Sequence, residues 1–359
     1  MKLVKPVNFR NIEKVSQLDF MENMKNYKIN NHFAVAVSGG PDSVALMLLS
    51  NEYANQLNIQ MTVICIDHNL REFSSTEVKW VRDQARKLGA SFISSKIPKN
   101  NLHTNLMSYA RDVRYKELYR ICSRKKIKTL LTAHHLDDEI ENFLMRLVRG
   151  SGIKGLSSLK EKSMVNNNRL KLVRPLLSYP KKSLVKYLSS KKQSYVSDPT
   201  NSNLNFDRSR MRLLSETLIE EGFSKNRFSI VIKNLKNANE AVDELISIYV
   251  PKIFIFYDNN KIKINLKNFY QSSEEIQFRI LSKLIRFVGF SDKIPRSKSI
   301  MQLISDFKSN QFKRSSLSGC QFIKEKTFVI CRPMNIKKSL LNSRKMLKNK
   351  DFIELTQNF

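Results

Sequence analysis

The sequence has few residues of the kinds that build disulfide-linked or metal-binding scaffolds. Its 359 residues include only four cysteines, Cys65, Cys122, Cys320 and Cys331, and no two of them form a C-x-x-C pair. That spacing indicates neither a zinc knuckle nor a redox pair, so a reduced, cytoplasmic location fits best. No apolar run approaches a membrane-spanning length, and the N-terminus lacks the apolar stretch of a signal peptide, so we expect no membrane partner.

Acidic residues are also scarce. The chain has 63 Lys and Arg against 32 Asp and Glu, which gives a formal net charge of +31. A field of that size favours a polyanionic partner, and nucleic acid is the first candidate. Lys, Asn and Ile are abundant along the whole chain, as a biased genome composition would also produce, so charge alone does not decide the partner.

The most informative stretch runs from residue 33 to residue 49 and contains FAVAVSGGPDSVALMLL. Residues 33–37 have the length and β-branched content of a buried strand, and residues 44–49 predict the first turns of a helix. The two glycines between them allow a tight turn with bare N–H groups, and the helix adds its positive N-terminal end. The turn is therefore suited to hold an anion such as phosphate, although a Gly-Gly turn can also simply join a strand to a helix.

The turn lacks the lysine that a Walker-type loop carries after its last glycine, because Pro41, Asp42 and Ser43 occupy those positions. Together with Ser38, the string SGGPDS resembles the SGGxDS loop of the PP-loop, or N-type, ATP pyrophosphatases. The resemblance implies that the protein splits ATP between its α and β phosphates and transfers AMP to an oxygen of the substrate.

Strands and helices alternate along the first half of the chain. Strands predicted at residues 60–66, 91–97 and 129–133 are separated by segments of helical periodicity. This pattern predicts an α/β fold with a doubly wound, mostly parallel, Rossmann-like sheet. Ligands of such sheets lie beyond the carboxyl ends of the strands, so we expect Asp67 and His68 to border the nucleotide, although His68 alone could equally be structural.

Arg111 lies between apolar neighbours on a predicted helix with a buried face. An unpaired guanidinium is costly in such surroundings. Arg111 therefore needs an anion, either the carboxylate of an ion pair or a nucleotide phosphate.

A second polar cluster, HHLDDEIEN at residues 134–142, opens a helix for which Asp137 is a candidate N-cap. His134, Asp138 and Glu141 share one side of that helix if its first turn begins early enough. Acids stabilise a helix N-terminus, but two histidines and four acids exceed that need. We interpret the cluster as a cation site, for magnesium or for the ammonium of a substrate.

Basic residues gather in two segments downstream of this cluster, one of them rich in glycine. Such segments are suited to contact a phosphate backbone, although a solvated turn and an exposed helix start are the alternatives. The candidate contacts are Arg149, Lys154, Arg208, Arg210 and Arg212.

Taken in order, these strings resemble those of bacterial tRNA(Ile)-lysidine synthases. They are SGGPDS, DHNLR, AR…RY, TAHHLDDE…E, RGSGIKGL, RPLL and DPTN…RSRMR. The resemblance covers residues 33–212, and Glu139 departs from it because the family usually has Gln there, a change from which we expect little effect.

The resemblance implies a two-step reaction on the wobble cytidine of the CAU anticodon of tRNA(Ile). ATP adenylates the C2 oxygen of the base, and the ε-amine of free L-lysine then displaces AMP to form lysidine. Pyrophosphate and AMP are released, and the codon specificity changes from AUG to AUA.

The resemblance also implies roles for individual residues. The loop residues Ser38, Gly39, Gly40, Pro41, Asp42 and Ser43 cradle the ATP phosphates, with Asp67 and His68 nearby. Asp42 holds Mg²⁺, and Arg111 stabilises the α-phosphate. His134, Asp138 and Glu141 form the lysine and activation site, where an amine with a pKa of about 10.4 must lose its proton before it attacks.

We expect four parts along the chain: an N-terminal extension at 1–30, a PP-loop ATPase catalytic domain at 31–215, a smaller tRNA-contacting domain at 216–335 and a basic tail at 336–359. The third part is predicted to be mainly helical, with a β-pair at 252–268 and a β-hairpin at 317–332. Within the catalytic domain, residues 172–177 predict an edge strand, because Pro175 would interrupt a central one.

Three alternatives remain open at this stage. A PP-loop tRNA thiolase activates a base in the same way but needs a persulfide cysteine pair or an iron–sulfur cluster. A nucleotide-dependent RNA-binding protein without turnover needs no acidic cluster, and a small-molecule ligase of the amidotransferase type does not need the positive charge. The sequence leaves the oligomeric state open, a homodimer included.

Overall fold

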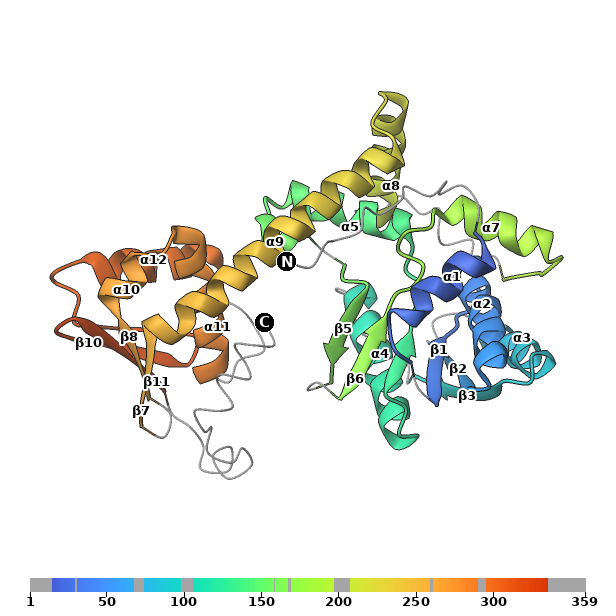
Figure 1. The fold of residues 1–359 in the computed structure, drawn as a ribbon, viewed down its shortest axis with the longest axis horizontal. Helices are drawn as coiled ribbons and strands as arrows, with labels where there is room; N and C mark the ends of the chain where they lie inside the picture. Colours follow the sequence, from blue (N-terminus) through green and yellow to red (C-terminus); the bar gives the residue numbers. More distant parts are fainter. Residues whose placement is uncertain are drawn as a thin grey trace. The chain divides into compact units, whose positions relative to one another are not determined.

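The computed structural model of the chain describes residues 15–29, 31–67, 74–97, 106–157, 159–166, 169–196, 207–258, 261–289 and 295–334. The chain forms two compact units and passes from the first to the second between Lys236 and Asn237 (Figure 1). The boundary expected at residues 215/216 falls inside helix α8 (Asp207–Glu220), which belongs to the first unit. Among the described residues, no helix is both long and apolar enough to cross a membrane.

The first unit is built on a six-stranded sheet with the order β3-β2-β1-β4-β6-β5. The strands are β1 (His32–Ala36), β2 (Gln60–Asp67), β3 (Ser91–Lys96), β4 (Thr129–Leu131), β5 (Lys162–Val165) and β6 (Leu170–Val173). All pairings are parallel except that of β5 with β6. The predicted doubly wound, mostly parallel sheet is confirmed.

Helices cover both faces of this sheet (Figure 1). One face carries α1 (Gln17–Lys25), α2 (Pro41–Leu57), α3 (Ser74–Lys87) and α7 (Lys181–Ser190), and the other carries α4 (Leu106–Arg124). Phe33 and Val35 of β1 belong to the first core and Ala34 to the second. A sheet covered on both sides requires such a continuous apolar strand, as the sequence of β1 indicates.

The N-terminal segment is part of the first core. Phe20 and Met24 of α1 are fully buried and pack with the residues of α2. The segment that we expected to be an extension therefore stabilises the first unit by packing.

The prediction of an edge strand at residues 172–177 was wrong. Strand β6 ends at Val173, before Pro175, and lies between β4 and β5. Because the strand stops before the proline, the missing N–H removes no ladder hydrogen bond, and β5 can pair on the outer side.

Four helices lie beyond the carboxyl end of β4: α5 (Leu136–Val148), α6 (Ile153–Leu156), α8 and α9 (Lys225–Ile253). A small apolar core joins α5 to the start of α9, where the rings of Phe143 and Phe228 meet edge to face with centroids 6.3 Å apart. This core fixes the position of α5, whose first turn carries the acidic cluster.

The second unit contains a five-stranded antiparallel sheet with the order β7-β8-β11-β10-β9. Its strands are β7 (Phe254–Asp258), β8 (Lys261–Asn265), β9 (Arg314–Leu317), β10 (Cys320–Glu325) and β11 (Phe328–Pro333). The helices are α10 (Leu266–Tyr270), α11 (Glu274–Val288) and α12 (Ser297–Lys308). The predicted hairpin is confirmed as β10–β11, and it joins the predicted β-pair through β8 and β11.

The charge of Glu139 is paired across the packing of α5 and α9. Its carboxylate is buried, and the ammonium of Lys236 lies 2.6 Å from it. Burial raises the pKa of Glu139, and the charge of Lys236 opposes that rise. A carboxylate at this position therefore depends on a lysine 97 residues away.

Replacing the lysine tests this dependence. Removing one partner of a fully buried pair costs roughly 3–5 kcal/mol, and we expect about 2 kcal/mol for Lys236→Met because Lys236 is 27% exposed. Urea denaturation measures this loss. It should be smaller at pH 5 than at pH 8, because a Glu139 whose pKa is raised favours folding while protonated and loses that contribution as the pH rises.

The double variant Glu139→Gln/Lys236→Met removes both charges and should recover most of the stability. A double variant as unstable as Lys236→Met alone would contradict this account of the pair.

Candidate functional site

The SGGPDS loop leaves β1 and enters α2 with its backbone amides exposed to a ligand. Gly40 is the N-cap of α2 and provides no side-chain hydrogen bond, while Pro41 takes the first helical position. The Ser43 hydroxyl closes the turn, because it accepts from the Ser38 N–H at 3.2 Å and donates to the Gly40 carbonyl at 2.9 Å. The loop is thus closed by its own side chain, and the N-terminus of α2 is left for an anion.

Gly39 is required by its surroundings. Its φ of +93° is a backbone angle that residues with a side chain rarely adopt, and a Cβ atom there would lie 3.1 Å from Cγ2 of Val196. The N–H of Val196 also donates to the Gly39 carbonyl at 2.9 Å. The close approach of residue 196 therefore fixes the shape of the loop.

A pocket of about 210 Å³ lies beside this loop, at the carboxyl ends of the strands. Many of the predicted residues line it together: Ser38, Gly40, Asp42, Ser43, Arg111, His134 and Asp138. It is also lined by Arg114, Tyr115 and Thr132, which belong to the strings AR…RY and TAHHLDDE but were assigned no role from the sequence. The loop, α4 and the residues after β4 thus contribute to a single pocket.

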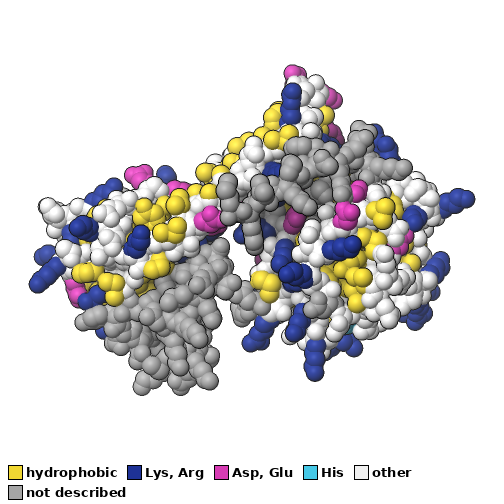
Figure 2. Space-filling model, in the orientation of Figure 1, with side chains coloured by type: hydrophobic (Ala, Val, Ile, Leu, Met, Phe, Trp, Pro, Cys, Tyr) yellow, Lys and Arg dark blue, Asp and Glu magenta, His cyan; other side chains and the backbone are white. Residues whose placement is uncertain are grey.

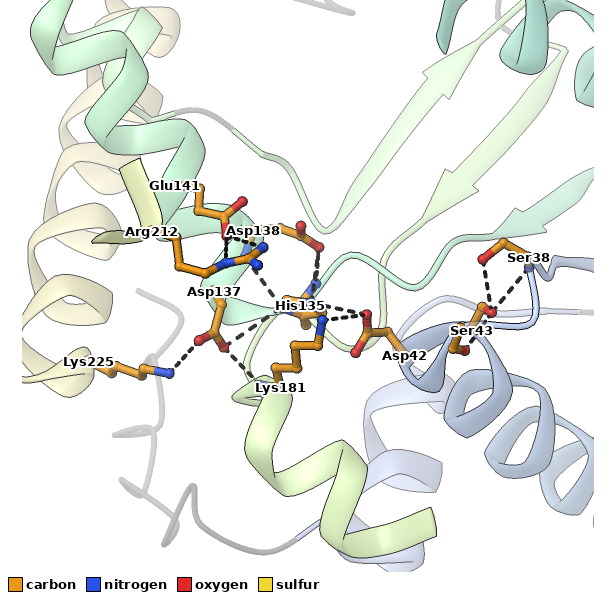
Figure 3. A network of polar contacts seen from close by, with 11 residues as sticks. Ser38, Asp42, Ser43, His135, Asp137, Asp138, Glu141, Lys181, Arg212 and Lys225 are labelled. Carbon is orange, nitrogen blue, oxygen red and sulfur yellow. Dashed lines mark hydrogen bonds and ion pairs between the residues drawn. The ribbon is translucent and has the colours of Figure 1, made fainter. Parts of the chain in front are cut away.

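His135 connects the loop to the acidic cluster (Figure 3). It is 4% exposed, and its Nε2 lies 3.4 Å from Oδ2 of Asp42 and 3.6 Å from Oδ2 of Asp138. Burial alone would lower the pKa of His135, but the contact with Asp42 and the charges of Asp138 and Asp137 raise it overall. A buried imidazole among three acids holds them in place.

His135 is also the N-cap of α5, where we had expected Asp137. Its Nδ1 accepts from the Asp138 N–H at 3.3 Å, and the Asp138 carboxylate accepts from the His135 N–H at 3.1 Å. Asp137 instead accepts from the backbone N–H of Lys181 at 2.8 Å and pairs with Lys225. Burial raises the pKa of Asp137, but these two partners lower it overall.

Asp42 has one oxygen available for a further ligand. Its Oδ2 faces His135 and lies 3.8 Å from the Lys181 ammonium, whereas Oδ1 is buried and has no hydrogen-bond partner. The described part of the chain contains no group of three or more His, Cys, Asp or Glu side chains that could hold a metal ion. Mg²⁺ commonly takes one or two carboxylates together with substrate phosphates, so the free oxygen of Asp42 fits a magnesium ion that arrives with a nucleotide.

His134 lies before α5, not on it, yet it faces the same pocket as Asp138. Its Nδ1 is 3.1 Å from the hydroxyl of Thr132, and its Nε2 is 3.4 Å from Nη2 of Arg111. Burial lowers the pKa of His134 to about 3. The charge of Asp138 raises this pKa, and the charges of neighbouring arginines lower it further. His134 is therefore neutral at physiological pH.

Glu141 lies one turn after Asp138 on α5 and is 3% exposed. Its carboxylate pairs with the guanidinium of Arg212 at 2.9 Å. We had expected Arg212 to contact a phosphate backbone, but a guanidinium that pairs with a buried acid belongs to the acidic cluster. Burial lowers the pKa of Arg212, and the charges of Glu141 and Asp138 raise it overall.

The other predicted residues lie outside this pocket or outside the described residues. Arg149, Lys154 and Arg210 are exposed, and Asp67 is buried at the end of β2. His68 and the side chain of Arg208 are among the residues that the structure does not describe.

The structure adds two residues to the site, His135 and Lys181, to which we had assigned no role from the sequence. His135 stands beside His134 in the HHLDDEIEN string, and the sequence does not show which of the two histidines caps α5. Lys181 follows Pro180 at the start of α7 and had no recognisable pattern. The contact of Lys181 with Asp42 joins residues far apart in the chain, and such a contact leaves no local pattern in a single sequence.

Comparison with known proteins agrees with this geometry. A family model described as "PP-loop domain" matches residues 12–217. The tRNA(Ile)-lysidine synthase of Wolbachia pipientis wMel is 33% identical over 299 residues, which cover 82% of this chain and 69% of the relative. The enzyme of the same name from Orientia tsutsugamushi is 32% identical, over 85% of this chain and 70% of the relative.

Among solved structures, a U34-tRNA thiolase from Methanococcus maripaludis with its [4Fe-4S] cluster superposes with a TM-score of 0.54 at 19% identity, over 62% of this chain and 77% of that one. This likeness shows the fold alone. The sequence matches show that the chain belongs to the tRNA(Ile)-lysidine synthase family of PP-loop, ATP-dependent tRNA-modifying enzymes.

Proposed function

We propose that this chain ligates free L-lysine to C2 of the wobble cytidine in the CAU anticodon of tRNA(Ile), through an adenylated base, with release of pyrophosphate and AMP. The observation that carries the proposal is the shared pocket. Residues of the anion-binding loop line one cavity of about 210 Å³ together with Arg111, His134 and Asp138, as a reaction that joins a phosphate, a base oxygen and an amine requires.

The loop side of the pocket supports activation by ATP. The amides of the loop and of the first turn of α2 hold phosphate oxygens, and Arg111 stabilises charge on the α-phosphate as AMP is transferred to the base. Mg²⁺ neutralises charge on the phosphates when it is bound. Asp42 holds it through Oδ1, which has no hydrogen-bond partner among the described residues.

The acidic side supports binding of lysine. Asp138, which lines the pocket, attracts the ammonium together with Glu141, which lies one turn further along α5. Arg212 pairs with Glu141, is 42% exposed and can hold the carboxylate of the free amino acid. This assignment replaces the contact with tRNA that we expected for Arg212.

The tautomer of His134 follows from its partners. A guanidinium can only donate, so Nε2 carries the lone pair that faces Arg111, and Nδ1 carries the proton that faces Thr132. A phosphate that draws Arg111 away leaves this lone pair to accept the proton of the attacking amine. The geometry thus couples the base to the presence of the activated substrate.

Three further observations bear on the alternatives. Cys65 packs in the core on one face of the first sheet and Cys122 in the core on the other, so these two thiols cannot form the pair that sulfur transfer needs. Cys320 and Cys331 are buried in the second unit. A protein that only binds RNA and a nucleotide does not need the acids that line the pocket, Asp42 and Asp138.

We propose that the tRNA backbone is held by exposed basic residues of both units, whose Lys and Arg side chains are spread over the face seen in Figure 2. In the first unit the exposed ones are Arg149, Lys154 and Arg210, and we include Arg208, whose side chain lies outside the described residues. In the second unit, five cations line a groove of about 760 Å³ beside β9, β10 and β11: Lys313, Arg314, Lys324, Lys326 and Arg332. A groove lined by cations fits a phosphate backbone.

The first test is transfer of labelled lysine to an unmodified tRNA(Ile) transcript with a CAU anticodon. We expect incorporation that requires ATP and Mg²⁺, and that falls at least 100-fold in Asp42→Asn, because a buried ligand oxygen is removed. Changing the wobble C to U should abolish it. AMP release without lysine incorporation would contradict the proposal and favour another nucleophile, and tRNA binding without AMP release would favour a binding protein.

A second test addresses the lysine site. Glu141→Gln should raise the KM for lysine about tenfold, the effect expected when one charged partner of the ammonium is removed, and leave the KM for ATP unchanged. Glu139→Gln is the matched control, because Glu139 lies on the same helix but pairs with Lys236. A rise in the KM for ATP of the same size would remove Glu141 from the lysine site.

A third test addresses the groove of the second unit. The triple variant Arg314→Glu/Lys326→Glu/Arg332→Glu should raise the KM for full-length tRNA. It should also reduce the dependence of tRNA affinity on salt by about one unit of slope for each phosphate group that the variant no longer binds. Its KM for ATP should stay at the wild-type value. A wild-type affinity for tRNA at every salt concentration would exclude the groove as a tRNA contact.

A further inference from the structure

Along one side of the pocket, two arginines gather around the ring of Tyr115. The guanidinium carbons of Arg111 and Arg114 lie 5.1 Å and 5.4 Å from the ring centroid of Tyr115. Tyr119 packs against Tyr115 at 5.7 Å between centroids. Arg174, which directly follows β6, is 8% exposed and close enough for its charge to act on Arg111 and His134.

Neither Arg111 nor Arg174 is neutralised by the described part of the chain. Nη1 of Arg174 donates to the carbonyl of Lys160 at 2.7 Å, and its Nε is buried without a hydrogen-bond partner. Arg111 contacts the neutral His134 and the face of Tyr115. Among the described residues, no carboxylate forms an ion pair with either of them.

A buried guanidinium, that of Arg174, and a half-buried one, that of Arg111, are unfavourable near each other unless an anion compensates them. Burial lowers the pKa of Arg174, and so does the charge of Arg111, yet arginine remains protonated in proteins. Of the two, only Arg111 lines the pocket. The repulsion between the two charges therefore falls when an anion binds beside Arg111 in the pocket.

We propose that Arg174 is a positioning residue for the nucleotide: its buried charge keeps Arg111 directed into the pocket and is compensated by the phosphate groups of bound ATP. Tyr115 supports the arrangement, because its ring lies within cation–π distance of both Arg111 and Arg114. The proposal rests on the use of ATP but not on lysine as the nucleophile.

A purely structural role is the alternative. Arg174 also ties the segment before β5 to β6, since its side chain binds the Lys160 carbonyl and its backbone N–H donates to the Glu161 carbonyl at 2.7 Å. The two roles predict opposite results for the unliganded protein. Removing an uncompensated charge relieves repulsion, whereas removing a structural tie lowers stability.

The test uses the full chain with Arg174→Met and Arg174→Lys, and with Arg120→Met as a matched control on the exposed side of α4. The probes are α,β-methylene-ATP, which is not cleaved between its α and β phosphates, and adenosine, which has no phosphate. Calorimetry measures affinity, and thermal unfolding measures the stability of the unliganded protein.

For Arg174→Met we expect an unchanged or higher melting temperature without ligand, affinity for α,β-methylene-ATP about tenfold weaker, and unchanged affinity for adenosine. Arg174→Lys keeps the charge and should stay within about threefold of the wild type, and Arg120→Met should match the wild type.

A lower melting temperature with wild-type affinity for α,β-methylene-ATP would overturn the proposal in favour of the structural tie. Equal losses of affinity for adenosine and for α,β-methylene-ATP would also overturn it, because they indicate a general distortion of the pocket. If Arg174→Met does not fold, the affinity of Arg174→Lys decides: a loss well beyond threefold contradicts a role based on charge. None of these outcomes depends on lysine transfer.

Discussion

The contact between His135 and Asp42 joins the two halves of the site. Asp42 lies in the first turn of α2, which follows β1, and His135 caps α5, which follows β4; these two strands are neighbours in the sheet. The imidazole is 4% exposed and touches three acids, so its position is set by burial as well as by charge. The phosphate loop and the acidic cluster therefore keep one relative placement, on which a transfer between their ligands depends.

The features that the sequence predicted well are local. The loop between β1 and α2 depends on a few adjacent residues, so its strand, its turn and its helix could all be inferred from their order. The parallel sheet followed from strands separated by helices. Its edge could not be inferred, because the pairing of β5 with β6 depends on where β6 ends and not on the presence of Pro175.

The features that the sequence did not predict are contacts across long separations. Arg212 has the spacing of a phosphate contact, yet it pairs with a buried acid 71 residues before it. In the same way, the sequence predicted the β-pair and the hairpin of the second unit separately, but it did not indicate that they join through β8 and β11. One sequence records which residues can make a contact, whereas the fold decides which partner lies within reach.

The pairing of Glu139 with Lys236 decides which of the two residues can be replaced alone. If residue 139 is a neutral Gln, the ammonium of Lys236 can still be hydrated, because Lys236 is 27% exposed. The combination of Gln at position 139 with Lys236 is therefore tolerated. A carboxylate placed there first is buried without a counter-charge. A change of Glu139 to Gln is therefore tolerated alone, whereas a change of Lys236 to a neutral residue requires that the carboxylate be lost first.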